Sequence, residues 1–182
     1  QLRARFPRLV YASLTGYGLA GPDKDAPGFD VAAFSARSGV AYRSAPPGAA
    51  PPILAGGMGD NVTAITTVAG IAAALLHRER TGQGQLVATS LLRAGIYSIG
   101  MDVATRIGLG RIAETPSRRT PQNPLMNPYA AADGRWLWLI GAESERHWPR
   151  IVAALGDETL ATEPMFETPR MRRRHAGELV DR

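Results

Sequence analysis

Residues 62–76 constrain the fold more than any other part of the chain. This stretch is almost wholly apolar or small, and three threonines are its only polar residues. An uncharged run of this length predicts a helix buried in a core. It is preceded by Gly56, Gly57, Gly59 and Asp60, and the sequence Thr-Gly-Gln-Gly at residues 81–84 predicts the turn that follows. The chain is therefore expected to build a domain around one long apolar helix.

Strands and helices alternate on both sides of this helix. Residues 8–14 and 85–89 are rich in apolar and β-forming residues, and the first of these strands ends at a glycine turn, residues 15–18. Further helices are expected over residues 30–38, with Asp30 as the N-cap, and over about residues 91–106. Strand–helix–strand–helix order predicts an α/β fold with a parallel or mixed sheet flanked by helices.

A smaller α+β domain is expected after a linker rich in Gly, Pro and Arg at residues 107–127. We place the boundary near residue 120, which gives domains of residues 1–120 and 121–182. Residues 129–140 predict a hairpin-like turn and strand, residues 144–155 a helix, and Thr168 the cap of another helix. Trp136 and Trp138 share one face of the predicted strand, and we expect them to pack the small domain.

Composition narrows the function classes. The chain has no cysteine, which excludes disulfides and thiolate chemistry, and its two helical histidines, His77 and His147, lack companions at metal-ligand spacing. The net charge is +5, but the basic run at residues 170–175 contains no interleaved aromatic residues and is expected to be a solvated face. The longest apolar run, residues 68–76, is too short for a membrane span. We therefore expect a cytoplasmic protein with no metal, nucleic-acid or membrane partner, and a basic binding module stays an alternative.

Asp60 is the main candidate for chemistry. It stands at the start of the apolar helix, behind glycines that leave the backbone open. A carboxylate there can be a helix cap, which contributes about 1 kcal/mol, or a nucleophile that forms a covalent intermediate. The spacing alone leaves both roles open.

Five motifs in a fixed order carry a family resemblance. They are Leu14-Thr-Gly-Tyr-Gly18, Gly21-Pro22, Gly28-Phe29-Asp30, Gly59-Asp60 and the sequence His-Arg-Glu-Arg-Thr-Gly-Gln-Gly-Gln at residues 77–85. Together they resemble the family III CoA-transferases, the relatives of formyl-CoA transferase, carnitine CoA-transferase and α-methylacyl-CoA racemase. The resemblance covers residues 8–106, and more weakly residues 127–156.

The resemblance implies a fold, a reaction and a set of site residues. Family members are interlocked homodimers of about twice this length, with a Rossmann-like large domain and a smaller domain, so the chain is expected to be part of a longer protein. The catalytic aspartate of the family matches Asp60. The implied reaction moves coenzyme A from an acyl-CoA to a carboxylic acid through an aspartyl anhydride and an aspartyl-CoA thioester. The residues expected to wall the CoA site are Gly16, Tyr17, Gly18, Phe29, Gly57 and Gly59.

Phe29 and residues 120–127 depart from particular members of the family. The racemases resemble this chain but carry a histidine at the position that matches Phe29, and phenylalanine cannot transfer a proton. This disfavours the alternative of an α-methylacyl-CoA racemase-like enzyme. Phe29 is expected either to line an apolar acyl pocket or to be a core aromatic residue. Formyl-CoA transferases have a glycine run where this chain has residues 120–127, which favours acids larger or more apolar than formate. An inactive fragment is the remaining alternative.

Overall fold

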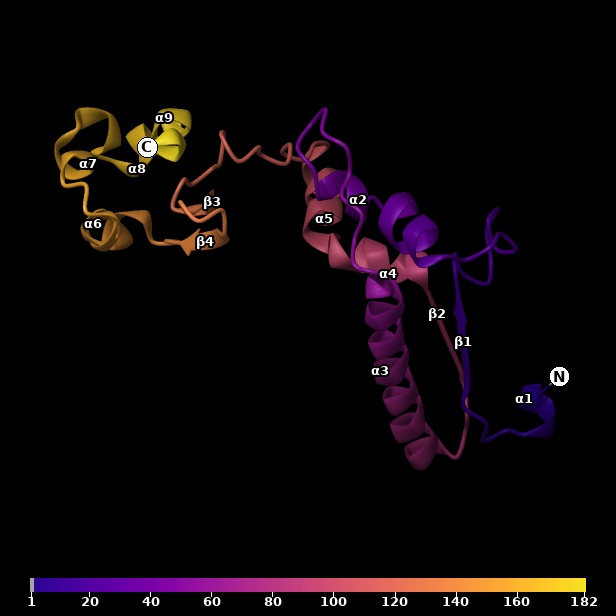
Figure 1. Cartoon of the computed structure of the whole chain (residues 1–182). Coiled ribbons are helices and arrows are strands. Elements are labelled where there is room, and N and C mark those ends of the chain that lie inside the picture. The colour runs from indigo at the N-terminus through magenta and orange to yellow at the C-terminus, as the bar shows by residue number, and fades with distance from the viewer. Residues whose placement is uncertain (1) are drawn as a thin grey trace. The chain divides into compact units, whose positions relative to one another are not determined.

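The structure, a computed structural model, describes residues 2–182. Two compact units divide between Glu114 and Thr115, and each is described by itself (Figure 1). The sequence-based boundary lies near residue 120.

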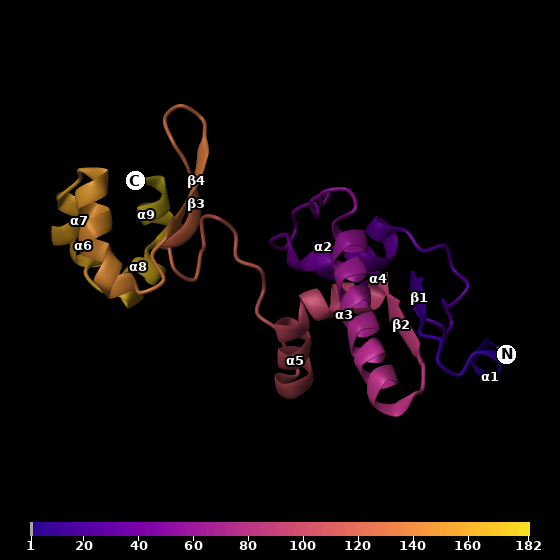
Figure 2. The same cartoon turned by 90° about the horizontal axis from the view of Figure 1, so that it is seen from below.

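The first unit is built around a parallel pair of strands and one long helix. Strands β1 (Tyr11–Thr15) and β2 (Leu86–Ser90) pair in parallel, with Tyr11 opposite Leu86 and Thr15 opposite Ser90. Helix α3 (Met58–Thr81) connects them and lies along β2 (Figures 1 and 2). The other helices of the unit are α1 (Leu2–Arg5), the π-helix η1 (Asp30–Arg37), α2 (Val40–Arg43), α4 (Leu91–Ser98) and α5 (Gly100–Leu109).

The second unit is an antiparallel hairpin with short helices. Strands β3 (Met126–Ala130) and β4 (Trp136–Ile140) pair with Met126 opposite Ile140. The helices are α6 (Ser144–Leu155), α7 (Thr159–Thr162), the 3₁₀ helix η2 (Pro164–Phe166), α8 (Pro169–Arg174) and α9 (Ala176–Asp181). A parallel sheet with helices, followed by a smaller antiparallel unit, confirms the predicted α/β class.

Each unit has its own apolar core. The core of the first unit is formed by Ala33, Phe34, Val40, Leu91 and Ala94, so it lies between η1, α2 and α4. The core of the second unit is formed by Leu125, Trp148, Val152, Leu160, Phe166 and Leu179. The first core thus packs around η1, the helix that follows the motif Gly28-Phe29-Asp30.

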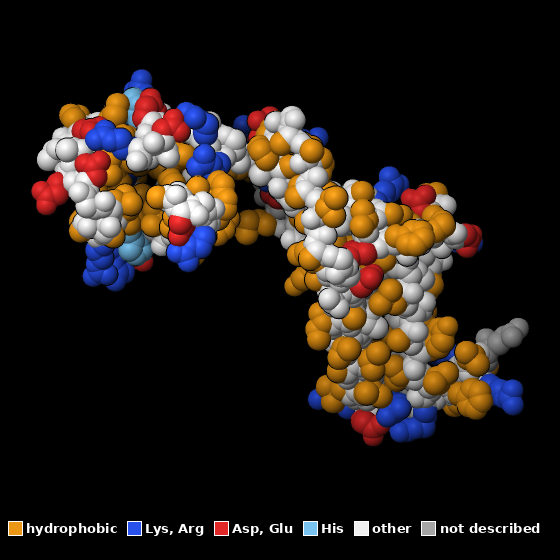
Figure 3. All heavy atoms as spheres, viewed as in Figure 1, with side chains coloured by type: hydrophobic (Ala, Val, Ile, Leu, Met, Phe, Trp, Pro, Cys, Tyr) orange, Lys and Arg blue, Asp and Glu red, His pale blue; other side chains and the backbone are white. Residues whose placement is uncertain are grey.

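Helix α3 is less buried than its sequence suggests. Ile65, Val68 and Leu76 are 65%, 57% and 54% exposed, and hydrophobic side chains gather on the surface of this unit along α3 (Figure 3). The helix has 24 residues and by length and composition could cross a membrane. The sequence-based prediction considered only the shorter apolar run at residues 68–76. Length and composition are weak evidence of a span, because core helices of soluble proteins meet the same criteria.

Two predicted helices differ in detail. The helix expected over residues 91–106 is broken at Ile99, whose φ of −109° and ψ of 26° are not helical, so that α4 and α5 form separately. Ile99 packs against the core of the first unit, and Gly100, a weak helix former, follows it. Asp30 was expected as the N-cap of residues 30–38, but that position belongs to Phe29, and Asp30 is the first helical residue.

Two side-chain predictions in the second unit are wrong. Trp136 and Trp138 are 63% and 67% exposed, because the alternate residue Leu139 is the one that packs against the core. Arg172, expected on a solvated face, is fully buried. Its guanidinium donates to the carbonyls of Phe166 at 2.7 Å and Glu167 at 3.1 Å. Its other terminal nitrogen donates to Ser144 Oγ and Glu145 Oε1, both at 3.2 Å, so the buried charge has backbone and side-chain acceptors.

Candidate functional site

Asp60 lies in the first turn of α3 with its carboxylate exposed. The helix begins at Met58, and its N-cap is Gly57, whose φ of 73° suits glycine. Within residues 2–182 the Asp60 carboxylate makes no hydrogen bond and no ion pair. The cap interpretation therefore does not describe this side chain, and the carboxylate is left accessible at the positive end of the helix dipole.

The backbone N–H of Asp60 is also without an acceptor in the described part of the chain. The neighbouring first-turn groups are bonded, since Met58 N donates to Ala55 O at 3.1 Å and Asn61 N donates to Gly57 O at 2.9 Å. Gly59 N donates to a side chain, Asp30 Oδ1, at 3.1 Å. Asp60 thus presents a free carboxylate and a free N–H donor from the same residue.

Gly59 joins α3 to η1 by close packing. It is buried, and a Cβ at this position would lie 2.2 Å from both Phe34 Cγ and Asp30 Oδ1. Only glycine lets the first turn of α3 approach η1 this closely. Gly59 was expected to wall the CoA site, and the structure shows that its lack of a side chain serves the contact with η1. Gly57, by contrast, has open space where a Cβ would be.

The segment before η1 makes a second close contact, with the loop after β1. A Cβ on Gly16 would lie 2.5 Å from Gly28 Cα, so the two backbones touch. Phe29, between Gly28 and Asp30, is 68% exposed, so the core interpretation of this aromatic residue is wrong. Residues 28–30 thus connect the Gly16 loop on one side with the start of α3 on the other. Most of the predicted site residues are brought together through this segment.

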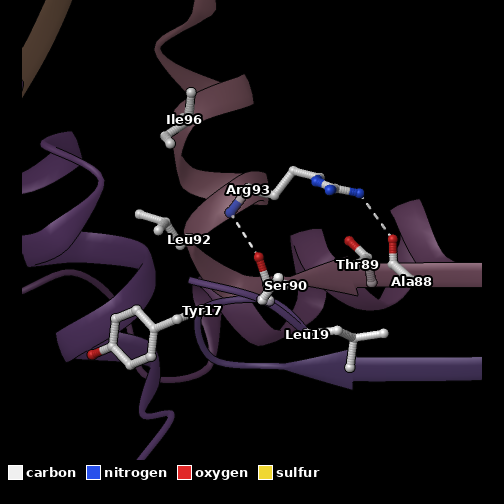
Figure 4. A pocket seen from close by; sticks show the side chains of 10 residues that line it. Tyr17, Leu19, Ala88, Thr89, Ser90, Leu92, Arg93 and Ile96 are labelled. Atoms are coloured by element: carbon white, nitrogen blue, oxygen red, sulfur yellow. Dashed lines mark hydrogen bonds between the residues drawn. The ribbon is translucent and has the colours of Figure 1, made fainter. Parts of the chain in front are cut away.

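A cavity of about 440 Å³ opens at the carboxyl ends of β1 and β2 (Figure 4). Its lining comes from the loop after β1, from β2 and from α4: Tyr17, Gly18, Leu19, Ala20, Ala88, Thr89, Ser90, Leu92, Arg93 and Ile96. Two predicted residues, Tyr17 and Gly18, are among them, whereas Asp60 is not. Ligands of open α/β sheets bind at this edge of the sheet.

Ser90 and Arg93 are polar residues of the cavity that sequence reasoning missed. Ser90 Oγ accepts from Arg93 N at 3.1 Å and so caps α4, and Arg93 Nη1 donates to Ala88 O at 2.9 Å (Figure 4). Ser90 ends the second parallel strand and Arg93 lies in the first turn of the helix that follows, and this position is the signal that could have indicated them. They bring a hydroxyl and a cation to a largely apolar cavity.

The described residues 2–182 contain no group of three or more His, Asp or Glu side chains arranged to hold a metal ion. The candidate site therefore consists of the Asp60 carboxylate and N–H on α3, the contact segment 28–30, and the cavity beside the Gly16 loop.

A comparison with protein families identifies the chain. The model of the family described as CoA-transferase family III matches residues 1–182. The chain belongs to this family. The resemblance found in the five sequence motifs is thereby confirmed.

Two curated CoA-transferases illustrate the similarity of this family III chain. It is 35% identical over 167 residues to cinnamoyl-CoA:phenyllactate CoA-transferase of Clostridium sporogenes, an alignment that covers 91% of the chain and 40% of that protein. It is 39% identical over 140 residues to (R)-2-hydroxy-4-methylpentanoate CoA-transferase of Clostridioides difficile, covering 76% of the chain and 34% of that protein. The chain thus spans well under half the length of these relatives.

Solved structures show the same fold. A CAIB/BAIF family protein from Brucella suis superposes with a TM-score of 0.85 at 23% identity, covering 99% of this family III chain and 47% of that protein. A protein from Mycobacterium tuberculosis gives a TM-score of 0.75 at 27% identity, with 99% and 46% coverage. The arrangement of elements described above is therefore shared with longer chains.

Proposed function

We propose that the protein containing this chain transfers coenzyme A between carboxylic acids, with Asp60 as the covalent nucleophile. The observation that carries the proposal is the exposed Asp60 carboxylate, unbonded within residues 2–182, in the first turn of α3. Family membership supports the type of reaction, since the relatives described above are named CoA-transferases.

The first half of the proposed reaction moves the CoA onto the enzyme. An Asp60 oxygen attacks the thioester carbonyl of the donor, the C–S bond breaks, and CoA leaves as a thiolate with the electron pair. The product is a mixed anhydride between Asp60 and the donor acyl group. The thiolate then attacks the aspartyl carbonyl, which releases the donor as a free carboxylate and leaves an aspartyl-CoA thioester.

The second half repeats these steps with the acceptor. The acceptor carboxylate attacks the aspartyl-CoA carbonyl and forms a new anhydride, again with CoA thiolate as the leaving group. The thiolate attacks the acceptor carbonyl, and Asp60 is released as a carboxylate. No net proton is consumed, so this series of reaction steps needs no general acid or base. That agrees with the absence of an ionisable group in the side chain of Phe29.

Each step passes through a tetrahedral oxyanion, and the chain offers a donor for it. The unbonded N–H of Asp60 points from the positive end of α3, where a developing negative charge is stabilised. Removing one such donor typically lowers the rate by about 10²–10³-fold. We propose this N–H as a first candidate for oxyanion stabilisation.

We propose that the cavity beside the Gly16 loop binds part of the acyl-CoA. Tyr17 and Leu92 offer apolar contact, and Arg93 offers a cation for an anionic group of the substrate. Phenyllactate and 2-hydroxy-4-methylpentanoate, in the names of the two relatives, are 2-hydroxy acids with apolar side chains. We therefore propose such acids as the first acceptors to test. We also propose that the whole protein is cytoplasmic and forms a homodimer. Analytical sedimentation of the intact protein tests the homodimer.

Mass spectrometry of the intact protein tests the covalent route. After incubation with acyl-CoA esters and trapping with hydroxylamine, we expect a modification that maps to Asp60 and is absent from Asp60→Asn. The exposed Asp25 provides the matched control, and Asp25→Asn should still form the adduct. Transfer by Asp60→Asn should fall by about 10³-fold or more. Undiminished transfer by Asp60→Asn would remove Asp60 from the mechanism.

A further inference from the structure

We propose that Asp30 is a positioning residue for Asp60. Its carboxylate binds the N–H of Gly59, the residue directly before Asp60, and so keeps the Asp60 carboxylate and N–H available to substrate. The inference rests on the proposed function, because it assigns a role toward the nucleophile of that reaction.

The bond between Asp30 and Gly59 joins distant parts of the chain. Asp30 Oδ1 accepts from Gly59 N at 3.1 Å, across 29 residues of sequence. Asp30 is half-buried and Gly59 is buried, so water competes poorly for this bond. A bond from an amide N–H to an ionised carboxylate is about twice as strong as one between neutral groups.

The peptide that carries the Asp60 N–H is held on its other side as well. Thr63, fully buried, donates its hydroxyl to the carbonyl of Gly59 at 2.7 Å. Gly59 is thus held at both polar groups, its N–H by Asp30 and its carbonyl by Thr63. The Gly59 carbonyl and the Asp60 N–H belong to one planar peptide, so fixing the carbonyl also fixes the direction of the free N–H.

The helix η1 supplies a rigid base for Asp30. Phe34, one turn further along η1 and 1% exposed, packs directly on Gly59. Gly28, two residues before Asp30, touches Gly16 through the backbone. Asp30 therefore acts from an element anchored in the core of the unit rather than from a free loop.

Competition for the Gly59 N–H explains why the bond matters for chemistry. Carboxylates in the first turn of a helix tend to fold back onto unsatisfied backbone N–H groups. If Asp30 were removed, the Gly59 N–H would lose its acceptor, and Asp60 would be the carboxylate nearest in sequence to replace it. A carboxylate engaged in that way is a weaker nucleophile and is turned away from the substrate. Asp30 takes over the capping, and Asp60 stays free to react.

Steady-state kinetics on the intact protein test the proposal with two substitutions at Asp30. Asp30→Ala deletes the acceptor, and we expect kcat to fall by about 10–100-fold with KM for the acyl-CoA changed less than about twofold. Asp30→Asn keeps an acceptor oxygen and should stay within about threefold of the wild type. The rate of adduct formation at Asp60 should fall with kcat in Asp30→Ala.

A stability control separates positioning from a structural effect. Asp102→Ala removes another half-buried carboxylate of the same unit, one that binds Arg43 Nε at 2.7 Å. It should lower the melting temperature and leave kcat unchanged. If Asp30→Ala fails to fold, Asp30→Ser replaces it in the experiment. The shorter serine side chain cannot reach Gly59 N, and the same fall in kcat with little change in KM is expected.

Two results would overturn the proposal while the proposed function stands. One is a kcat of Asp30→Ala within twofold of the wild type, and the other is an equal loss in Asp30→Asn and Asp30→Ala. Failure of the proposed function gives a different result, because Asp60→Asn would then still transfer CoA and form the adduct. In that case the proposed role of Asp30 would also be wrong.

Discussion

Gly59→Ala is the substitution for which the structure makes the sharpest prediction. A Cβ at this position would lie 2.2 Å from Phe34 Cγ and from Asp30 Oδ1, and 2.4 Å from Phe34 Cβ. Carbon atoms pack at about 3.5–4.0 Å, so the new methyl group would overlap its neighbours by more than about 1 Å. Neither neighbour can give way easily, since Phe34 is 1% exposed and Asp30 holds the Gly59 N–H.

Two opposing effects set the magnitude. Glycine inside a helix is less favourable than alanine by about 0.5–1 kcal/mol, so the substitution would stabilise an isolated α3. Overpacking of a filled site costs about 1–3 kcal/mol and occasionally more. Because the contact involves two atoms at 2.2 Å, we expect the upper part of that range and a net loss of about 1–2 kcal/mol. Because the entropy of unfolding grows with chain length and the relatives are more than twice this length, that is a melting temperature of the intact protein lower by about 1–3 °C.

The glycines before α3 provide matched controls for this experiment. Gly56 has open space around its Cβ position and no positive φ, so Gly56→Ala should leave stability within about 0.5 kcal/mol. Gly57 has open space but a φ of 73°, so Gly57→Ala should cost about 1–2 kcal/mol through backbone strain alone. Thermal unfolding and CoA-transfer rates of the three variants of the intact protein are compared. Gly59→Ala should be the only one that also displaces Asp30 and lowers the rate of adduct formation at Asp60.

The reasoning would be refuted by Gly59→Ala matching Gly56→Ala in both stability and rate. In that case the contact between η1 and the first turn of α3 would not be tight, and Asp30 would not be held against Gly59. A loss of stability with an unchanged rate would retain the packing argument and separate it from the positioning of Asp60.

Three further predictions concern the second unit. Arg172→Met leaves the buried carbonyl of Phe166 and the half-buried carbonyl of Glu167 without their donor, and it should cost about 1–3 kcal/mol by denaturant unfolding. The exposed Arg173→Met should cost less than about 0.5 kcal/mol. Burial raises the pKa of the Tyr129 hydroxyl above its ordinary value of 10.0. The folded state therefore holds this proton more tightly than the unfolded state does. The stability that results is complete below pH 10 and is lost as the pH rises through the pKa of the folded state. The unfolding free energy of Tyr129→Phe should therefore depend less on pH above 10. The substitution also removes the bond from the Tyr129 hydroxyl to Pro124 O, which lowers the stability at neutral pH. An equally steep loss of stability above pH 10 in both proteins would show that Tyr129 is not its cause. Thr168→Ala removes the oxygen that accepts from Met171 N and should cost about 1 kcal/mol, and an unchanged unfolding midpoint would show that the cap is dispensable.

Local patterns predicted most of the elements. The strand at residues 85–89, the turn at residues 81–84, and the strand and helix after the predicted hairpin-like turn agree closely with β2, the end of α3, β4 and α6. Strand β3 was not predicted, since it begins in the expected linker. These elements depend on turn residues, apolar runs and caps that act over a few positions, so the sequence carries their signal directly. The family was readable for the same reason, because its motifs are short and ordered along the chain.

The wrong predictions involve residues whose role depends on distant neighbours. Arg172 looks solvated in a basic run, yet it is buried, and its guanidinium binds carbonyls at the end of η2 and just after it that no local pattern reveals. Trp136 and Trp138 look like core residues, yet Leu139 on the opposite face of β4 meets the helices. Which face of a two-sided strand is buried is decided by packing, and alternation alone does not distinguish the faces when both are apolar.

The sequence by itself determined that this chain is an α/β member of the CoA-transferase family III with Asp60 at the start of a long apolar helix. Only the tertiary structure decided what surrounds that carboxylate. It showed that Asp30, 29 residues earlier, binds the first turn of α3, and that Gly59 is glycine because Phe34 packs on it. Helix and strand periodicity act along the chain, whereas the bonding of one N–H depends on which distant side chain the folded core brings within 3.1 Å.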